Sequence, residues 1–152
     1  MAPVPHPPGY GAQGYGAAPD AVPVPPGAAI VEIQTGYTPM AFLLGLTGPD
    51  VLVDGRIVGT RWGQCPVPVA PGRHQVSIHT RYLGQMGKAH LVLDAAPGQR
   101  VPVFYRPPAL VGMRGAIGHV PQSTPGMGAI VALNVVAVAL IFLLLLVPLL
   151  AG

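Results

Sequence analysis

The residues of this chain that could carry out acid–base, nucleophilic or metal chemistry are few and far apart. Catalytic groups must converge on one substrate, and a metal ion needs three or four ligands. No carboxylate pair is evident among the acidic residues, which are Asp20, Glu32, Asp50, Asp54 and Asp94. The chain contains no G-x-S-x-G, no H-E-x-x-H and no phosphate-binding glycine loop. We therefore expect a protein without enzymatic activity and without a cofactor.

The single cysteine and the histidines predict no metal or redox site. Cys65 has no partner for an internal disulfide, and it stands beside Pro66 among alternating Val and Pro residues, where a free cysteine packs as a small hydrophobic residue. His79 and His90 could face each other across a hairpin at residues 83–88. Two or three strand histidines without Cys-x-x-Cys or His-x-x-x-His spacing are too few ligands. We expect solvated histidines and no metal ion.

The longest apolar segment, residues 129–150, has no charged side chain and a single amide. As a helix it would rise about 33 Å, slightly more than the roughly 30 Å hydrocarbon core of a bilayer. Arg106, Arg114 and His119 precede it, and basic residues stay on the inner side of a membrane. The N-terminus starts with Pro and Gly residues instead of a secretory signal. We expect a single-pass, tail-anchored protein of the inner cell membrane with a cytosolic N-terminal domain.

The apolar segment also contains residues that could support helix association. Gly128, Ala132 and Ala139 fall near one stripe of the helix, and small residues let spanning helices approach closely. Asn134 could exchange an amide hydrogen bond of about 1 kcal/mol with a neighbouring helix. A weak homodimer is one interpretation, and ordinary anchor composition is the other.

Composition divides the chain into four parts. Residues 1–28 hold eight Pro and five Gly with Asp20 as the only charge, which is too little apolar surface to offset chain entropy. We expect a disordered arm that acts as a spacer or, alternatively, binds an aromatic groove as polyproline II. Residues 29–108 have the composition of strands, 109–128 form a Gly/Pro-punctuated linker, and 129–150 form the span.

Two local patterns in the strand-rich part are especially informative. Asp54 and Gly55 lie between two β-branched runs, and this pair tolerates the positive φ angles of a type I′ hairpin. Residues 74–82 alternate strictly between polar and apolar side chains, with Val76, Ile78, Thr80 and Tyr82 on the apolar face. The alternation predicts a strand with one buried and one solvated face.

The remaining strands and turns predict a mainly β fold. Pro102 lies within the strand-like residues 100–105 and favours a position near a sheet edge. Ala-Pro-Gly sequences at 70–73 and 96–99 predict type II turns. Further strands are expected at 29–34, 65–69 and 88–94. Six or seven short strands without an amphipathic helix indicate a small antiparallel β-sandwich.

Two stretches within this part carry a resemblance. Residues 51–59 (VLVDGRIVG) and 67–78 (VPVAPGRHQVSI) resemble PEGA-type domains, immunoglobulin-like sandwiches of bacterial envelope and membrane-linked proteins. The longer run from residues 37–44 (YTPMAFLL) to 105–108 (YRPP) is similar to uncharacterised membrane proteins of high-GC bacteria. The resemblance covers about half of the chain. It implies a sandwich that serves as a non-catalytic module, since such turn motifs specify architecture.

Basic residues outnumber acidic ones in the expected domain. Residues 29–120 contain eight Lys and Arg against four Asp and Glu. Beside a membrane, each such cation contributes about 1 kcal/mol of attraction to anionic head groups. Nucleic acid is not an expected partner, because the cations are scattered singly and aromatic side chains for base stacking are few.

The most apolar stretch outside the span is residues 40–46. Three interpretations remain open: a buried strand or short helix, a loop that dips into the adjacent bilayer, or a patch for a partner protein. The candidate membrane or partner contacts combine this stretch with nearby basic and aromatic residues: Phe42, Leu43, Leu44, Leu46, Arg61, Trp62, Arg106 and Arg114.

These observations favour a membrane-anchored β-sandwich that serves as a protein-interaction or scaffold module at the cytosolic face, with an unknown membrane-associated protein as partner. The alternative is an accessory module that binds anionic head groups through its basic residues and residues 40–46.

Overall fold

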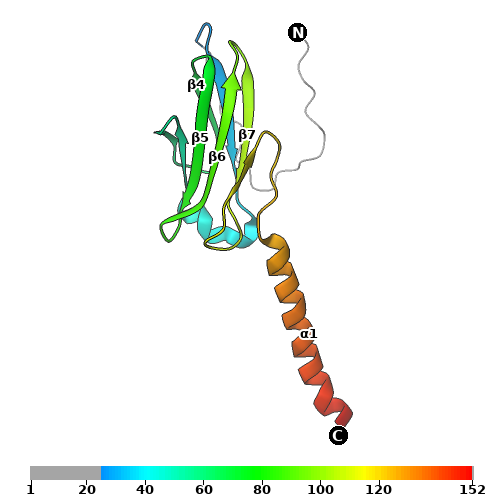
Figure 1. The fold of residues 1–152 in the computed structure, drawn as a ribbon. Helices are drawn as coiled ribbons and strands as arrows, with labels where there is room; N and C mark the ends of the chain where they lie inside the picture. The colour runs from blue at the N-terminus through cyan, green and yellow to red at the C-terminus, as the bar shows by residue number, and fades with distance from the viewer. Residues whose placement is uncertain (1–24, 152) are drawn as a thin grey trace.

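The computed structural model describes residues 25–151, without the side chains of Met40, Phe42 and 148–151. Most of the arm expected to be disordered, residues 1–24, lies outside the described residues. The described chain forms a β-sandwich followed by one long helix, α1 (Met127–Ala151), as Figure 1 shows.

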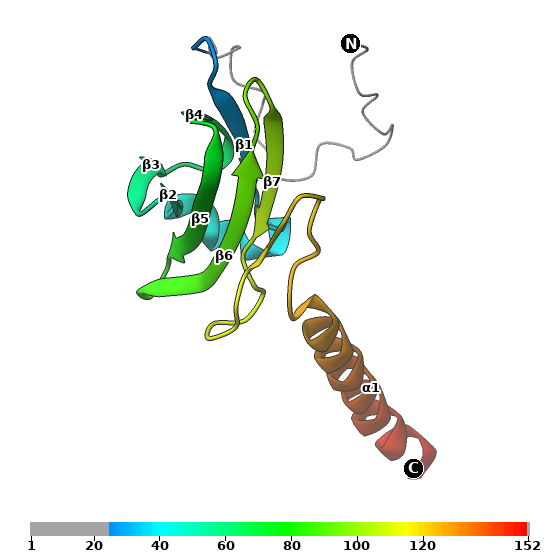
Figure 2. The ribbon, with the colours of Figure 1, turned by 45° about the horizontal axis from the view of Figure 1, so that its top comes forward.

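Two four-stranded sheets form the sandwich, and Figure 2 shows them from a second angle. The first contains, in spatial order, β4 (Gly63–Val69), β1 (Ala29–Thr35), β7 (Arg100–Arg106) and β8 (Ala116–Gly118). The second contains β3 (Arg56–Gly59), β2 (Pro49–Val53), β5 (Gly72–Arg81) and β6 (Gln85–Ala95). Neighbouring strands are antiparallel except β1 and β7, which run parallel. The expected small antiparallel β-sandwich is confirmed, with β1 and β7 as a parallel pair within it.

Alternating strand residues fill the space between the sheets. Val76, Ile78 and Thr80 of β5 are buried, as their alternation predicts. Tyr82 lies beyond the end of this strand. Each buried Val or Ile side chain contributes about 1.5 to 3 kcal/mol relative to exposure. The core is therefore built mostly from small β-branched residues: Val31, Ile33, Val51, Val53, Val67, Val69, Val76, Ile78, Val101 and Val103, with Leu93 and Tyr105.

The Asp54-Gly55 hairpin has the expected geometry. Asp54 (φ 50°) and Gly55 (φ 79°) both have positive φ and connect β2 to β3, as a type I′ turn requires. The turn at 96–99 agrees with type II, because Gly98 has φ 72° and the N–H of Gln99 donates to Ala96 O over 3.0 Å.

The second expected type II turn is absent. Gly72 has φ 138° and already belongs to β5, whereas a type II turn places this residue near φ 80°. The Ala70 carbonyl instead lies 2.7 Å from Nε2 of His74. A side chain thus takes the place of the backbone donor that would close the turn.

Pro102 was expected to favour a position near a sheet edge, and its strand β7 lies between β1 and the three-residue edge strand β8 (Ala116–Gly118). In the parallel pairing, the N–H of Ile30 donates to Gln99 O over 2.8 Å. The ladder therefore turns the backbone nitrogen of Val101 towards β1 and that of Pro102 towards the other neighbour. That neighbour, β8, pairs only with residues 104–106. The proline consequently removes no ladder hydrogen bond.

Residues 109–128, expected to form a linker, pack against the sandwich and supply β8. The N–H of Ala109 donates to Pro125 O over 2.8 Å. A Cβ on Gly126 would lie 3.0 Å from the Met113 sulfur, so the loop and the start of α1 approach closely. The helix therefore begins directly at the end of the sandwich.

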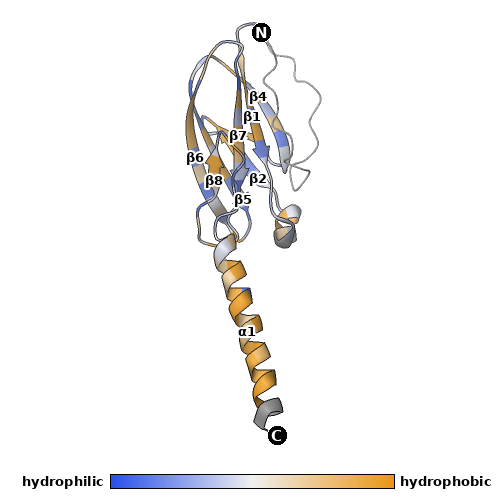
Figure 3. Ribbon diagram, turned by 90° about the vertical axis from the view of Figure 1, so that its right-hand side faces the viewer, coloured by the Kyte–Doolittle hydropathy of each residue, from blue (hydrophilic) through white to orange (hydrophobic). Residues whose placement is uncertain are grey.

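The apolar segment forms a helix long and apolar enough to cross a membrane. Its residues Met127–Val147 number 21, and none of this segment is buried inside the described fold. At 1.5 Å per residue, that length gives about 32 Å, enough for the hydrocarbon core of a bilayer. Figure 3 shows the hydrophobic residues along α1.

Candidate functional site at the α1 end of the sandwich

Among the connections at the end of the sandwich from which α1 leaves, three carry exposed apolar side chains. They are the 3-10 helix η1 (Pro39–Leu46) after β1, the turn 82–84 between β5 and β6, and residues 107–115 between β7 and β8. Strands β1, β5 and β7 all run towards this end, which Figures 1 and 2 show beside the start of α1. A membrane entered by α1 would face these three connections.

Helix η1 is fixed to the sandwich by aromatic residues. The indole N–H of Trp62 donates to Leu44 O over 2.7 Å. The ring of Trp62 meets that of Tyr37 edge to face, with centroids 5.1 Å apart, a favourable aromatic geometry. A Cβ on Gly45 would lie 2.5 Å from the Tyr37 hydroxyl oxygen, so glycine is needed for this approach. Trp62, expected as a membrane or partner contact, thus anchors η1 to the sandwich.

The predicted apolar stretch is divided between burial and exposure. Leu44 is 4% exposed, whereas Leu43 is 46% and Leu46 is 84% exposed. The side chain of Phe42 lies outside the described residues. The interpretation as a short helix with buried residues therefore applies to Leu44. Leu43 and Leu46 form an exposed apolar surface, which the other two interpretations, contact with the bilayer or with a partner protein, both require.

Further apolar side chains are exposed at this end, and the sequence reasoning did not identify them. Leu83 is 82% exposed in the β5–β6 turn, and Val111 is 60% exposed in the 107–115 loop. Leu110 and Met113 are 43% and 41% exposed. Isolated apolar residues in Gly-rich turns were the only sequence signal for this group.

A cleft of about 320 Å³ separates the β5–β6 turn from the 107–115 loop. Its lining combines apolar and cationic side chains, including Leu83, Val111, Met113, Lys88 and Arg114. A second cleft of about 540 Å³ lies between β6 and β8 and shares Lys88 and Arg114. The two cations therefore stand where the clefts meet.

The other basic residues on the sandwich lie outside this cleft or are already paired. Arg61 is exposed in the β3–β4 connection, and Arg106 is half-buried at the end of β7. Arg81 pairs with Asp50, its Nε lying 3.4 Å from Oδ1. The structure thus brings Arg114 into the cleft with Lys88, a residue missing from the expected contacts.

The histidine pairing considered from sequence is wrong. The β5–β6 register opposes His90 to Ser77, whose hydroxyl lies 2.9 Å from Nδ1, and a register shift follows between Ile78 and Thr80. His79 instead lies 3.3 Å from Asp50. Among residues 25–151, no three His, Cys, Asp or Glu side chains are placed to hold a metal ion.

Cys65 is half-buried on β4, with its sulfur 3.6 Å from Val58 O. Burial raises the pKa of the thiol, so the reactive thiolate is disfavoured at neutral pH. Its position agrees with the packing role expected from the sequence.

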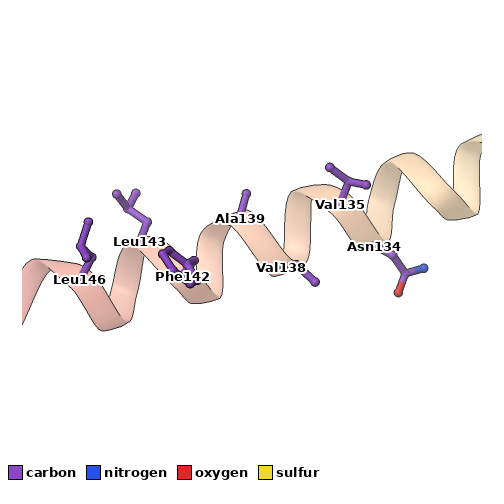
Figure 4. Close-up of a pocket in the computed structure, with 7 residues that line it drawn as sticks. All are labelled: Asn134, Val135, Val138, Ala139, Phe142, Leu143 and Leu146. Atoms are coloured by element: carbon purple, nitrogen blue, oxygen red, sulfur yellow. The ribbon is translucent and has the colours of Figure 1, made fainter.

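On α1, Gly128, Ala132 and Ala139 are exposed, so the small-residue stripe is open to a neighbour. The side-chain amide of Asn134 donates to Ile130 O over 2.8 Å within the same helix. Ala139 lines a shallow apolar groove on α1 with five larger residues, whose side chains Figure 4 shows along the helix: Val135, Val138, Phe142, Leu143 and Leu146. Asn134 lines the same groove.

Comparisons with known proteins give no assignment for this arrangement. No protein-family model matches the chain, and no curated protein matches its sequence.

Proposed function

We propose that this protein is a membrane-anchored, non-catalytic β-sandwich that serves as a protein-interaction or scaffold module at the cytosolic face of the inner membrane. The observation that carries the proposal is the direct attachment of a small sandwich to a helix able to span a membrane. Helix α1 begins where the 107–115 loop packs, as the hydrogen bond between Ala109 and Pro125 and the Gly126–Met113 approach indicate. The sandwich is consequently presented at the lipid surface.

The roles of the polar side chains support a non-catalytic module. The His74–Asp54, His79–Asp50 and Ser77–His90 pairs join neighbouring strands or turns. Each pair is accounted for by packing of the sandwich, and the pairs lie on separate strand positions instead of converging on a cleft. The exposed strand faces would then serve as the surface for a partner protein.

Positive charge near α1 supports the cytosolic placement. Arg61, Lys88, Arg106 and Arg114 lie on strands or loops towards the α1 end, and Lys and Arg beside a span are retained on the inner side. The PEGA-type resemblance fits the same proposal, since its Asp54-Gly55 hairpin and alternating β5 strand are features of the sandwich.

Reporter fusions test the placement. A reporter that works only in the cytosol should be active when it is fused before residue 1. A reporter that works only outside the cytosol should be active when it is fused after residue 152. The reverse pattern would refute cytosolic presentation. Cross-linking of the full chain in membranes should then recover a protein partner through the sandwich. Recovery of the same proteins with an anchor that carries no sandwich would refute the scaffold role.

The exposed apolar side chains at the α1 end favour a second function, direct binding of anionic membrane lipid. Leu46 and Leu83 are more than four-fifths exposed, and Leu83 lines a cleft with Lys88 and Arg114. Interfacial segments combine exposed apolar and basic side chains. A fragment ending at Gly126 should float with vesicles that contain anionic lipid and detach in high salt. Flotation with neutral vesicles alone would contradict charge-assisted binding.

A further inference from the structure

The β5–β6 turn exposes a leucine in a backbone conformation that leucine disfavours. Leu83 has φ 48° and is 82% exposed. Asn, Asp or Gly adopts this conformation more readily and exposes no apolar surface. Asp54 occupies the equivalent conformation in the β2–β3 turn with φ 50°. A disfavoured conformation at an exposed apolar residue indicates a functional constraint on Leu83.

The opposite wall of the 320 Å³ cleft presents Val111 and Met113. Two close contacts fix this wall. A Cβ on Gly115 would lie 2.5 Å from Gly87 O, and a Cβ on Gly87 would lie 2.5 Å from Cδ of Pro108. The loop is therefore held against β6, so the apolar residues on both walls face the α1 end of the sandwich in a defined arrangement.

Two cations without ion-pair partners complete the cleft. In the part of the chain that the structure describes, neither Lys88 nor Arg114 forms an ion pair, and both are exposed. Asp50, the acidic residue near this end, is already paired with Arg81 and His79. The cleft consequently offers two positive charges to an anion, with apolar walls beside them.

The location of the cleft determines which anion is nearest. Because α1 starts beside the 107–115 loop, a bilayer around α1 brings its head groups to the cleft. A phospholipid matches the lining in both respects, since its phosphate is anionic and its acyl chains are apolar. A free anion would gain nothing from exposed Leu83 and Val111.

We propose that this cleft binds one anionic phospholipid of the membrane that α1 enters. Lys88 and Arg114 hold the head-group phosphate, and Leu83 and Val111 contact the beginning of the acyl chains. The inference rests on the proposed membrane placement of the sandwich, and it adds a defined lipid site to it.

Native mass spectrometry of the full chain in detergent tests the site. The protein is titrated with phosphatidylglycerol or phosphatidylcholine of identical acyl chains. One phosphatidylglycerol should be retained with about thirtyfold preference, as expected from two cations near an anionic head group. Equal retention of the two lipids would overturn the proposal.

Variants localise the binding. The Lys88→Ala/Arg114→Ala variant should lose the preference, whereas the matched Arg56→Ala/Arg73→Ala variant, which removes two exposed cations elsewhere on the sandwich, should keep it. Leu83→Asn should lower retention of both lipids. Unchanged retention in the cleft variants would refute the site. Displacement of phosphatidylglycerol by equimolar glycerol 3-phosphate would also refute it, by showing that a free anion suffices.

Carbonate extraction separates this inference from the proposed function. The cleft variants should remain in membranes, because α1 is intact. Loss of lipid preference in a protein that still resists carbonate is the expected result. Extraction of the unaltered protein by carbonate would instead refute the membrane anchoring on which both proposals depend.

Discussion

His74 joins two turns of the sandwich through an imidazole held between two oxygen atoms. Its Nδ1 lies 2.6 Å from Oδ2 of Asp54, and its Nε2 lies 2.7 Å from Ala70 O. Both oxygens accept hydrogen bonds, so both nitrogens must donate, and only the protonated ring can do so. The other carboxylate oxygen of Asp54 accepts the N–H of Gln75 over 2.9 Å. The β2–β3 hairpin is thereby tied to the start of β5.

This arrangement predicts that the sandwich loses stability as pH rises from below 6.5 through the raised pKa of His74. The hydrogen bond to Asp54, followed by that to Ala70, raises the pKa of His74 above 6.5. A raised folded-state pKa stabilises the protein fully below the unfolded value, and this stability is lost as pH rises through the folded value. Urea denaturation of a fragment of residues 25–126 should therefore give a lower midpoint at pH 8.5 than at pH 6.

The matched controls are His74→Asn and His90→Asn. The first should remove most of this difference between the two pH values, and the second should retain it. A second loss of stability is expected in acid, as Asp54 becomes protonated. The hydrogen bond from Gln75, followed by that from His74, lowers the pKa of Asp54 below 3.8. An equal pH response in the His74→Asn and unaltered fragments would show that the imidazole stays neutral.

Replacing Tyr105 by Phe should destabilise the sandwich by about 1 to 3 kcal/mol. The Tyr105 hydroxyl is fully buried, donates to Gly87 O over 2.8 Å and lies 3.3 Å from Oγ1 of Thr80. Burial raises its pKa to about 12, so it remains a donor at physiological pH. The phenylalanine ring would leave the Gly87 carbonyl without this partner.

The measurement is the free energy of unfolding of the 25–126 fragment in urea, with Tyr82→Phe as the control. Tyr82 is half-buried in the β5–β6 turn, so the control should change stability little. Equal stability of the Tyr105→Phe and unaltered fragments would mean that water replaces the lost hydroxyl.

The 40–46 segment offers a pair of leucines for separating packing from surface contact. Leu44→Ser should cost about 2 kcal/mol or more of stability, because Leu44 is the buried leucine of η1. Leu46→Ser should leave the melting temperature nearly unchanged, since 84% of Leu46 is exposed, and should weaken flotation with anionic vesicles. Comparable melting temperatures for the two variants would contradict the division of this segment.

The features that the sequence predicted correctly depend on a few adjacent residues. Asp54-Gly55 encodes its own turn, and the alternation along β5 marks its buried face without information on its neighbours. Pro102 could not by itself predict the strand order, because distant segments set it: β1 pairs along one side of β7, and β8 pairs with residues 104–106 alone on the other. The expected partner of His79 was wrong because the turn lies at residues 82–84 instead of 83–88, and the resulting register opposes His90 to Ser77.

The candidate site was only partly predictable because it is assembled from segments far apart in the chain. Composition identified the apolar residues 40–46. Arg114 was identified by its position shortly before the apolar segment 129–150. Leu83 and Lys88 join the site only through the β5–β6 hairpin and the packing of the 107–115 loop. The only local signal at Leu83 is the glycine that follows it, which marks a turn and does not specify the positive φ of the leucine.

Leu83 allows stability and lipid contact to be changed in opposite directions. At φ 48°, leucine carries a conformational cost of roughly 1 kcal/mol that asparagine largely avoids. Leu83→Asn should therefore raise the melting temperature of the 25–126 fragment by a few degrees and reduce its flotation with anionic vesicles. Leu46→Asn is the matched control, because Leu46 is equally exposed without a positive φ, and it should lower flotation without stabilising the fragment. A fragment whose melting temperature falls with Leu83→Asn would show that Leu83 contributes to packing, and the functional interpretation of the turn would be lost.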